Sequence, residues 1–126
     1  MHKSKLSGFI IDCQTDDLDA ATQFWSAALG MKRESLPPEE EEKYRRLDDR
    51  QHGLHIEVQK VSHPSRIHLD IETDDIEAEV ARLEKLGAKR VQAVSRWWVM
   101  EAPTGQRFCV VNASTDSFDS SATQWR

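Results

Sequence analysis

Cysteine is scarce in this chain, because Cys13 and Cys109 are the only two among 126 residues. They do not form a CxxC pair, and two cysteines are too few for the disulfide framework of a small secreted domain. Both are therefore expected to be reduced thiols. Long hydrophobic runs are lacking too, and the basic N-terminus leads into only a short apolar strand, so neither a membrane span nor a signal peptide is predicted. We expect a cytoplasmic protein.

An excess of basic residues is also absent. The 17 Lys and Arg residues are outnumbered by 22 Asp and Glu, which gives a formal net charge of −5. This balance argues against nucleic acid or an anionic membrane surface as the main partner. A length of 126 residues suits one compact domain with its own core. The composition is that of an acidic globular protein.

What the chain does contain is an internal repeat. The segment DCQTDDLDA at residues 12–20 returns as DIETDDIEA at residues 70–78, an offset of 70 − 12 = 58 residues. Each copy is followed by an apolar helical pattern that ends in Leu29-Gly30 or Leu86-Gly87. A repeat of this length predicts two similar halves that pair into one domain and leave a cleft between them.

Each half predicts the same order of elements. A strand at 9–13 precedes a helix whose N-cap pair we place at Asp16 and Asp19, and the second half repeats this pair as Asp74 and Glu77. Gly30 and Gly87 are natural residues to end these helices. A short Lys-Arg segment follows each helix, and further extended runs are expected at 44–47, 54–60, 97–101 and 107–111. Each half therefore reads βαβββ.

The remaining segments are polar. The acidic run at 37–43 is interpreted as a solvated loop, and residues 61–65 as the connector between the halves. Residues 113–126 form a polar C-terminal tail, in which Phe118 and Trp125 could dock on a neighbouring surface.

Alternation along the strands predicts a polar face for a ligand. Leu54, Ile56 and Val58 make one side of their strand apolar and leave His55, Glu57 and Gln59 on the other. The same reasoning gives a concave face with convergent polar groups that carries Glu57, Gln59, His68, Asp70, Arg107 and Cys109. Trp97 and Trp98 point to opposite faces, so one packs in the core and the other can line the pocket.

Two segments carry a resemblance to a known family. Residues 68–88, which begin HLDIETDDIEA, and residues 98–111, WVMEAPTGQRFCVV, resemble the second module of the glyoxalase-like branch of the vicinal oxygen chelate superfamily. This superfamily includes glyoxalase I, extradiol dioxygenases, fosfomycin-resistance transferases and bleomycin-binding proteins. The resemblance extends over almost everything from Phe9 to Val111.

The resemblance implies an α+β fold, in which two βαβββ modules form a cupped mixed sheet with the helices outside. It places a single domain at 1–112, with modules at about 6–61 and 66–112, and implies a homodimer. A βαββαβ ferredoxin-like dimer is the less favoured alternative, because it has one strand fewer in each half.

The resemblance also implies positions for a divalent metal such as Zn, Ni, Mn or Fe. They are Ile10, Glu57 (with Gln59 as a register alternative), His68 and Cys109. Ile10 cannot ligate, and Cys109 stands where a glutamate usually closes the site. Glu57, His68 and Cys109 could still hold a metal with water as a fourth ligand. The broken set favours a metal-free pocket.

Individual residues allow more than one role. His68 could be a general base or a ligand, or could only hydrogen-bond to Asp70 or Glu57. Asp12 and Asp70 are interpreted as structural, because catalytic groups seldom need to be duplicated.

The favoured function is binding of a small organic molecule, cationic or polar aromatic, in the cup. The alternative is a metal-dependent lyase, isomerase or dioxygenase acting on a substrate with vicinal oxygens, in which Glu57 or His68 moves a proton. Metal-independent acid-base catalysis by His68 with Glu57 is a third hypothesis. The candidate ligand-binding residues are His55, Glu57, Gln59, His68, Asp70, Trp97, Trp98, Arg107 and Cys109.

Overall fold

The computed structural model describes residues 1–49 and 51–126, which form two compact units. Unit 1 contains Met1–Gly8 and His68–Arg126, and unit 2 contains Phe9–Ile67. The long first strand, β1 (His2–Gln14), begins in unit 1 and ends in unit 2. No described helix is long and apolar enough to cross a bilayer.

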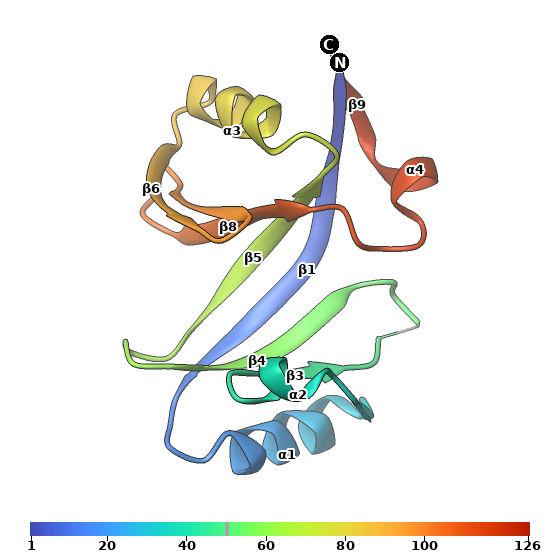
Figure 1. The fold of residues 1–126 in the computed structure, drawn as a ribbon, viewed down its shortest axis with the longest axis vertical. Helices are drawn as coiled ribbons and strands as arrows, with labels where there is room; N and C mark the ends of the chain where they lie inside the picture. The colour runs from blue at the N-terminus through green and yellow to red at the C-terminus, as the bar shows by residue number, and fades with distance from the viewer. Residues whose placement is uncertain (50) are drawn as a thin grey trace. The chain divides into compact units, whose positions relative to one another are not determined.

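Unit 2 is built on the first copy of the repeat. After β1 it contains α1 (Leu18–Leu29), β2 (Arg33–Glu34), α2 (Pro38–Glu41), β3 (Tyr44–Leu47) and β4 (His55–Val61). Its strands lie in the order β2-β3-β4-β1, and β3 is antiparallel to both β2 and β4. The helix α1 covers one face of these strands (Figure 1). The core between them consists of Leu18, Leu47, Ile56 and Val58.

Unit 1 repeats the pattern with the second copy. It contains β5 (Arg66–Thr73) from His68 onward, α3 (Ile76–Lys85), β6 (Lys89–Val94), β7 (Trp97–Glu101) and β8 (Arg107–Asn112). β5 is parallel to β8, and β7 is antiparallel to both β8 and β6. The helix α3 covers one face (Figure 1), over a core of Val80, Leu83, Met100 and Val110. The βαβββ order, the mixed pairing and the α+β class are confirmed.

Both helix starts lie one residue later than the sequence analysis placed them. The N-cap of α1 is Asp17, whose carboxylate accepts a hydrogen bond from Ala20 N–H at 3.0 Å, and not Asp16. The N-cap of α3 is Asp75, which accepts from Ala78 N–H at 3.1 Å, and not Asp74. Asp74 instead accepts from Lys3 N–H at 2.8 Å. Two adjacent aspartates offer equal capping chemistry, and the turn geometry selects the second.

The glycines after the helices are confirmed as terminators. Gly30 is the C-cap of α1 and has φ 68°, in the left-handed region that glycine adopts without a Cβ clash. Gly87 follows the C-cap Leu86 and has φ 109°. A Cβ on Gly87 would also lie 3.1 Å from Pro103 Cγ, so this position is restricted by packing as well.

Two segments have more regular structure than the sequence indicated. Part of the acidic run, expected to be a loop, forms the short helix α2, with Pro38 at a position where its missing N–H has no cost. The C-terminal tail forms α4 (Phe118–Ser121) and β9 (Thr123–Trp125), and β9 pairs antiparallel with the start of β1. Phe118 is buried, and Trp125 Nε1 donates to Ser4 Oγ at 2.8 Å. The two chain ends therefore lie side by side (Figure 1).

Candidate functional site

The strand β5 separates polar from apolar side chains in unit 1. Ile71 packs against the core under α3, so His68, Asp70 and Glu72 point to the opposite face by alternation. Asp70 and Glu72 are buried, and the His68 side chain is only 11% exposed. The alternation along β5 thus aligns three titratable groups on one face.

The neighbouring strands add to this face. Phe108 and Val110 of β8 pack on the α3 side, which leaves Arg107 and Cys109 on the side of Asp70. Cys109 is the direct pairing partner of Asp70. Arg107 Nε lies 3.4 Å from Glu101 Oε1 of β7, so the guanidinium is balanced by a carboxylate on the same face.

The roles of the two tryptophans follow from their packing. Trp98 packs against the core of unit 1 and lies beneath Arg90, whose guanidinium carbon is 5.0 Å from the ring centroid. By alternation, Trp97 is on the polar face with Cys109 and Arg107. Trp97 is therefore the aromatic candidate for a ligand contact.

Three side chains on this face form a compact donor cluster. One ligand atom each from His68, Asp70 and Cys109 lies within 4.8 Å of both others. His68 Nε2 and Asp70 Oδ1 are 3.5 Å apart. That separation is long for a hydrogen bond but matches the edge of a tetrahedral metal site, about 3.3–3.5 Å for metal–ligand bonds of about 2.0–2.2 Å. Imidazole nitrogen, carboxylate oxygen and thiolate sulfur together suit zinc, so these residues fit a divalent metal.

One oxygen of Asp70 strengthens this interpretation. Asp70 Oδ1 is buried and accepts no hydrogen bond from the residues that the structure describes, with His68 Nε2 at 3.5 Å beyond good hydrogen-bond distance. A buried carboxylate oxygen without a donor costs free energy, since water solvates it in the unfolded chain. The site is therefore suited to a group with positive charge or a polarised hydrogen.

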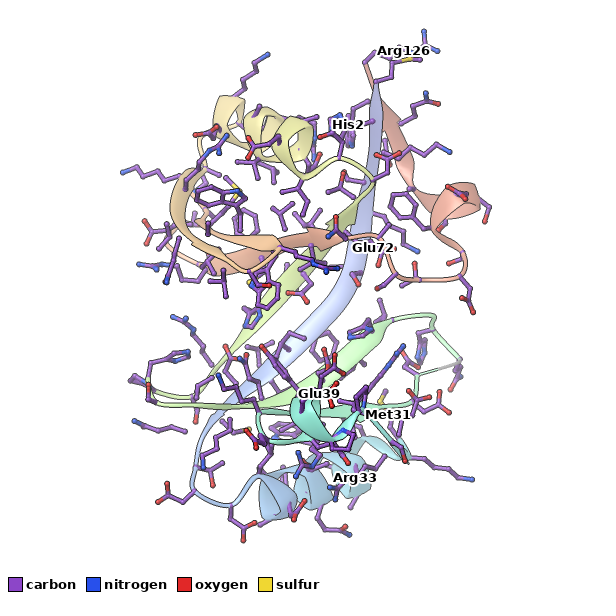
Figure 2. All side chains as sticks on the ribbon, in the orientation of Figure 1. His2, Met31, Arg33, Glu39, Glu72 and Arg126 are labelled. Atoms are coloured by element: carbon purple, nitrogen blue, oxygen red, sulfur yellow. The ribbon has the colours of Figure 1, made fainter. Side chains whose placement is uncertain are left out.

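Glu72 lies further along the same face and is fully buried. Figure 2 shows it on β5, near the segment that leads into the tail. Thr115 from that segment donates to Glu72 Oε1 through its hydroxyl at 2.5 Å and through its N–H at 3.4 Å. The tail thus holds Glu72 in place beside the donor cluster.

Unit 2 has a polar face of its own. His55 Nε2 lies 2.8 Å from Glu57 Oε1, with side chains 20% and 18% exposed. Gln59 Nε2 donates to Tyr44 Oη at 3.2 Å. The imidazole–carboxylate pair at His55 and Glu57 has the spacing needed for proton transfer between the two groups.

The other cysteine is in a different environment. Cys13 belongs to unit 2 and packs beside the core there. Burial raises the pKa of the Cys13 thiol, and the nearby Asp12 carboxylate raises it further. A thiol that resists ionisation is a poor nucleophile and a poor metal ligand.

The structure therefore brings together part of the predicted site in unit 1. His68 and Cys109, expected to share a metal, lie close together with Asp70, which the sequence analysis interpreted as structural. The third expected ligand, Glu57, belongs to unit 2, where its partner is His55. Asp70 was already expected on this face, because its spacing of two residues from His68 puts both on one side of the strand. What the sequence did not indicate is that Asp70 would join His68 and Cys109 as a third donor.

Comparisons with known proteins agree with this architecture. The family profile of the glyoxalase-like domain matches residues 8–111. No curated protein sequence matches the chain. Its fold is similar to that of a methylmalonyl-CoA epimerase solved with methylmalonyl-CoA and NH4+, with a TM-score of 0.58, 17% identity, and coverage of 89% of this chain and 96% of that one.

Two further structures are similar at the level of fold. The methylmalonyl-CoA epimerase of Mycobacterium tuberculosis has a TM-score of 0.59 at 19% identity, covering 86% of this chain and 88% of that one. A member of the glyoxalase/bleomycin resistance protein/dioxygenase superfamily from Vibrio splendidus 12B01 has a TM-score of 0.52 at 16% identity, covering 85% and 98%. With a profile match over most of its length and this fold, the chain belongs to the glyoxalase-like domain family of the vicinal oxygen chelate superfamily.

Proposed function

We propose that this protein binds a small organic molecule on the polar face of unit 1, around His68, Asp70 and Cys109. The observation that supports this most directly is the buried Asp70 Oδ1, which accepts no hydrogen bond from the described residues. A ligand with an ammonium, N–H or O–H group would supply a donor. Trp97, half-buried on the same face, would contact an apolar or aromatic part of the ligand.

A divalent-metal-dependent lyase, isomerase or dioxygenase is the second candidate, and the donor cluster favours it. His68, Asp70 and Cys109 would hold the metal, in place of the set Glu57, His68 and Cys109 expected from the resemblance. When bound, such a metal polarises paired substrate oxygens as a Lewis acid.

The experiment that separates the two functions measures metal content and ligand binding in the same set of proteins. Wild type, Asp70→Asn, His68→Ala and Cys109→Ser are purified without affinity tag or chelator, with Cys13→Ser as the matched thiol control. Metal content comes from elemental analysis before and after dialysis against zinc. A thermal-shift screen of small organic molecules follows on the wild type and on Asp70→Asn.

For the organic-ligand function, we expect no stoichiometric metal and compounds that raise the wild-type Tm but not that of Asp70→Asn. For the metal function, we expect near-stoichiometric metal that is retained in Cys13→Ser and falls at least tenfold in the other variants, as loss of one of three protein ligands would produce. A folded Asp70→Asn that behaves like the wild type in both assays would contradict both functions.

Assembly and location are part of the proposal. A homodimer in the cytoplasm is what the superfamily resemblance and the composition favour. Size-exclusion chromatography with light scattering tests the first point, and a mass of one chain would refute it.

A further inference from the structure

We propose that unit 2 contains a second binding site, for a small organic anion, in a pocket between Lys43 and Lys60 on the α1 side of its sheet. The pocket has a volume of about 490 Å³ and is bounded by the end of β1, the start of β3 and the end of β4. A volume in this range is typical of small-molecule sites. The proposal is independent of the donor cluster in unit 1.

The first argument is the placement of the two lysines. Lys60 N–H donates to Lys43 C=O at 2.8 Å, and the adjacent residues Tyr44 and Gln59 are pairing partners. Lys43 and Lys60 are therefore directly opposite each other across two antiparallel strands. Like charges at such positions repel each other and destabilise the pair. An anion between the two ammonium groups would turn this repulsion into attraction.

The second argument is that other basic residues nearby are paired, whereas these two are not. Arg45 lies on the same side of β3, and its Nη2 is 3.3 Å from Asp19 Oδ1. Arg33 Nη2 is 2.7 Å from the same carboxylate oxygen. Among the described residues, neither Lys43 nor Lys60 has an ion pair, so their charges are available to a ligand.

The walls of the pocket are held in place by two hydrogen bonds between side chains and backbone. Gln14 Nε2 donates to Ser62 C=O at 2.8 Å, and Gln14 N–H donates to Ser65 Oγ at 2.9 Å. These bonds join the end of β1 to the segment after β4 without using the lysines. A preformed wall lowers the entropic cost of binding, because less of the site must be ordered.

The charge balance favours one anionic group. Two ammonium groups and the Asp16 carboxylate, which also lines the pocket, leave a local charge of about +1. The chain as a whole is acidic, with a formal charge of −5, but that distant charge is screened over about 8–10 Å at physiological ionic strength. A single carboxylate or phosphate head group is the chemistry that fits. The remaining volume and the Val61 side chain accommodate an organic body.

The pocket and the polar face of unit 2 lie on opposite sides of the sheet. Lys60 alternates in step with Ile56 and Val58, which pack under α1, whereas His55 and Glu57 point the other way. A ligand in the pocket therefore does not compete with one held by the His55–Glu57 pair.

The test uses inorganic phosphate and acetate as probes of the two head groups, with chloride at matched ionic strength as the control. The proteins are the wild type, Lys43→Gln, Lys60→Gln and, as a matched charge control in unit 1, Lys89→Gln. The readouts are the Tm in each titration and amide chemical shifts in two-dimensional NMR. Circular dichroism confirms that each variant is folded.

We expect at least one probe to give a saturable rise in Tm for the wild type and Lys89→Gln, with at least a fivefold weaker midpoint in Lys43→Gln and Lys60→Gln. We also expect Lys60→Gln without probe to melt about 1–4 °C higher than the wild type, because the cross-strand repulsion is relieved. The amide shifts should centre on Gln14, Lys60 and Ser62.

Three results would overturn the proposal. One is a Tm rise that chloride reproduces, which would indicate general screening or an adventitious ion only. Another is equal binding by Lys89→Gln and both pocket variants. The last is a set of amide shifts in the wild type that is centred outside the pocket, which would place the anion elsewhere. This result does not depend on whether the pocket variants fold.

Discussion

Glu79 is a fully enclosed charged group of unit 1, with a side chain that is 0% exposed. Arg82 binds it through two hydrogen bonds of 2.8 and 2.7 Å, and His2 Nε2 lies 2.7 Å from Oε1. Figure 2 shows His2 at the start of β1, beside α3. Burial alone raises the pKa of the Glu79 carboxyl, but the hydrogen bonds from Arg82 and His2 outweigh burial and hold the pKa below its ordinary value.

The lowered pKa of Glu79 predicts how the free energy of unfolding changes with pH. Because the folded pKa of Glu79 is lowered, its contribution to stability is complete above the ordinary pKa of about 4.5 and is lost as the pH falls through the folded value. At pH 7, Glu79→Gln should lower the free energy of unfolding by about 3 kcal/mol, because Arg82 loses its charged partner. Urea unfolding from pH 7 to pH 3 should show this difference shrinking as the pH falls.

The control for Glu79 is Glu77→Gln, which removes the same charge from an exposed position on the same helix. It should change the free energy of unfolding by less than about 1 kcal/mol at pH 7. A difference between Glu79→Gln and wild type that stays constant over the whole pH range would show that the ion pair is not its source.

For Asp12 and Asp70, the sequence predicted the position on the strand but not the interaction partners. The two aspartates occupy the same position in the two copies of the repeat. A residue present in both copies was expected to have a structural role. Asp12 Oδ2 lies 3.7 Å from the Arg66 guanidinium, whereas Asp70 faces His68 and Cys109. A repeat predicts position on a strand, but the neighbouring strand determines the partners, and a single sequence does not specify them.

Some helices and strands could be predicted from the local sequence pattern, whereas others depend on pairing with segments far away in the sequence. The helices α1 and α3 are evident from apolar spacing and terminal glycines, and β7 and β8 from alternation. The first residues of β1 are polar and were not predicted as a strand. They form one within the sheet, where residues 2–4 pair with β9 and His2 lies opposite Trp125. Pairing between the two ends of a chain leaves no local signal.

The helix caps supply a prediction at the scale of elements. Asp17→Ala should lower the free energy of unfolding by about 1 kcal/mol, because the Ala20 N–H at the start of α1 loses its acceptor. Asp16→Ala is the matched control and should have little effect, since Asp16 is exposed and does not cap the helix. Chemical denaturation of both variants measures the difference. If Asp16→Ala lowered the free energy of unfolding more than Asp17→Ala, Asp16 would be the N-cap, as the sequence suggested.

At the scale of the whole molecule, the pairing of β1 with β9 predicts tolerance of circular permutation. Joining Arg126 to Met1 through about four Gly and Ser residues and opening the chain between Ser35 and Leu36 should leave a cooperative transition, with a free energy of unfolding within about 2 kcal/mol of wild type. Ser35 is exposed and lies between β2 and α2. Far-UV circular dichroism and urea unfolding provide the measurement.

The appropriate control is the unpermuted chain with the same linker inserted between Ser35 and Leu36. If that chain folds and the permutant does not, the ends must be free to separate, contrary to the pairing of β1 with β9. If both fail, the insertion point is at fault, and the permutant is then opened at the exposed residues Thr104 and Gly105.

The division of unit 1 between the two ends of the sequence also has a consequence for biosynthesis. On the ribosome, residues 9–67 emerge as one continuous stretch, so unit 2 has all of its chain before translation is complete. Residues 1–8 leave the exit tunnel before unit 2, whereas β9, which pairs with the start of β1, leaves it after unit 2. A chain that ended before β9 would thus have β1 unpaired at one edge, the type of exposed edge that promotes aggregation and proteolytic clearance.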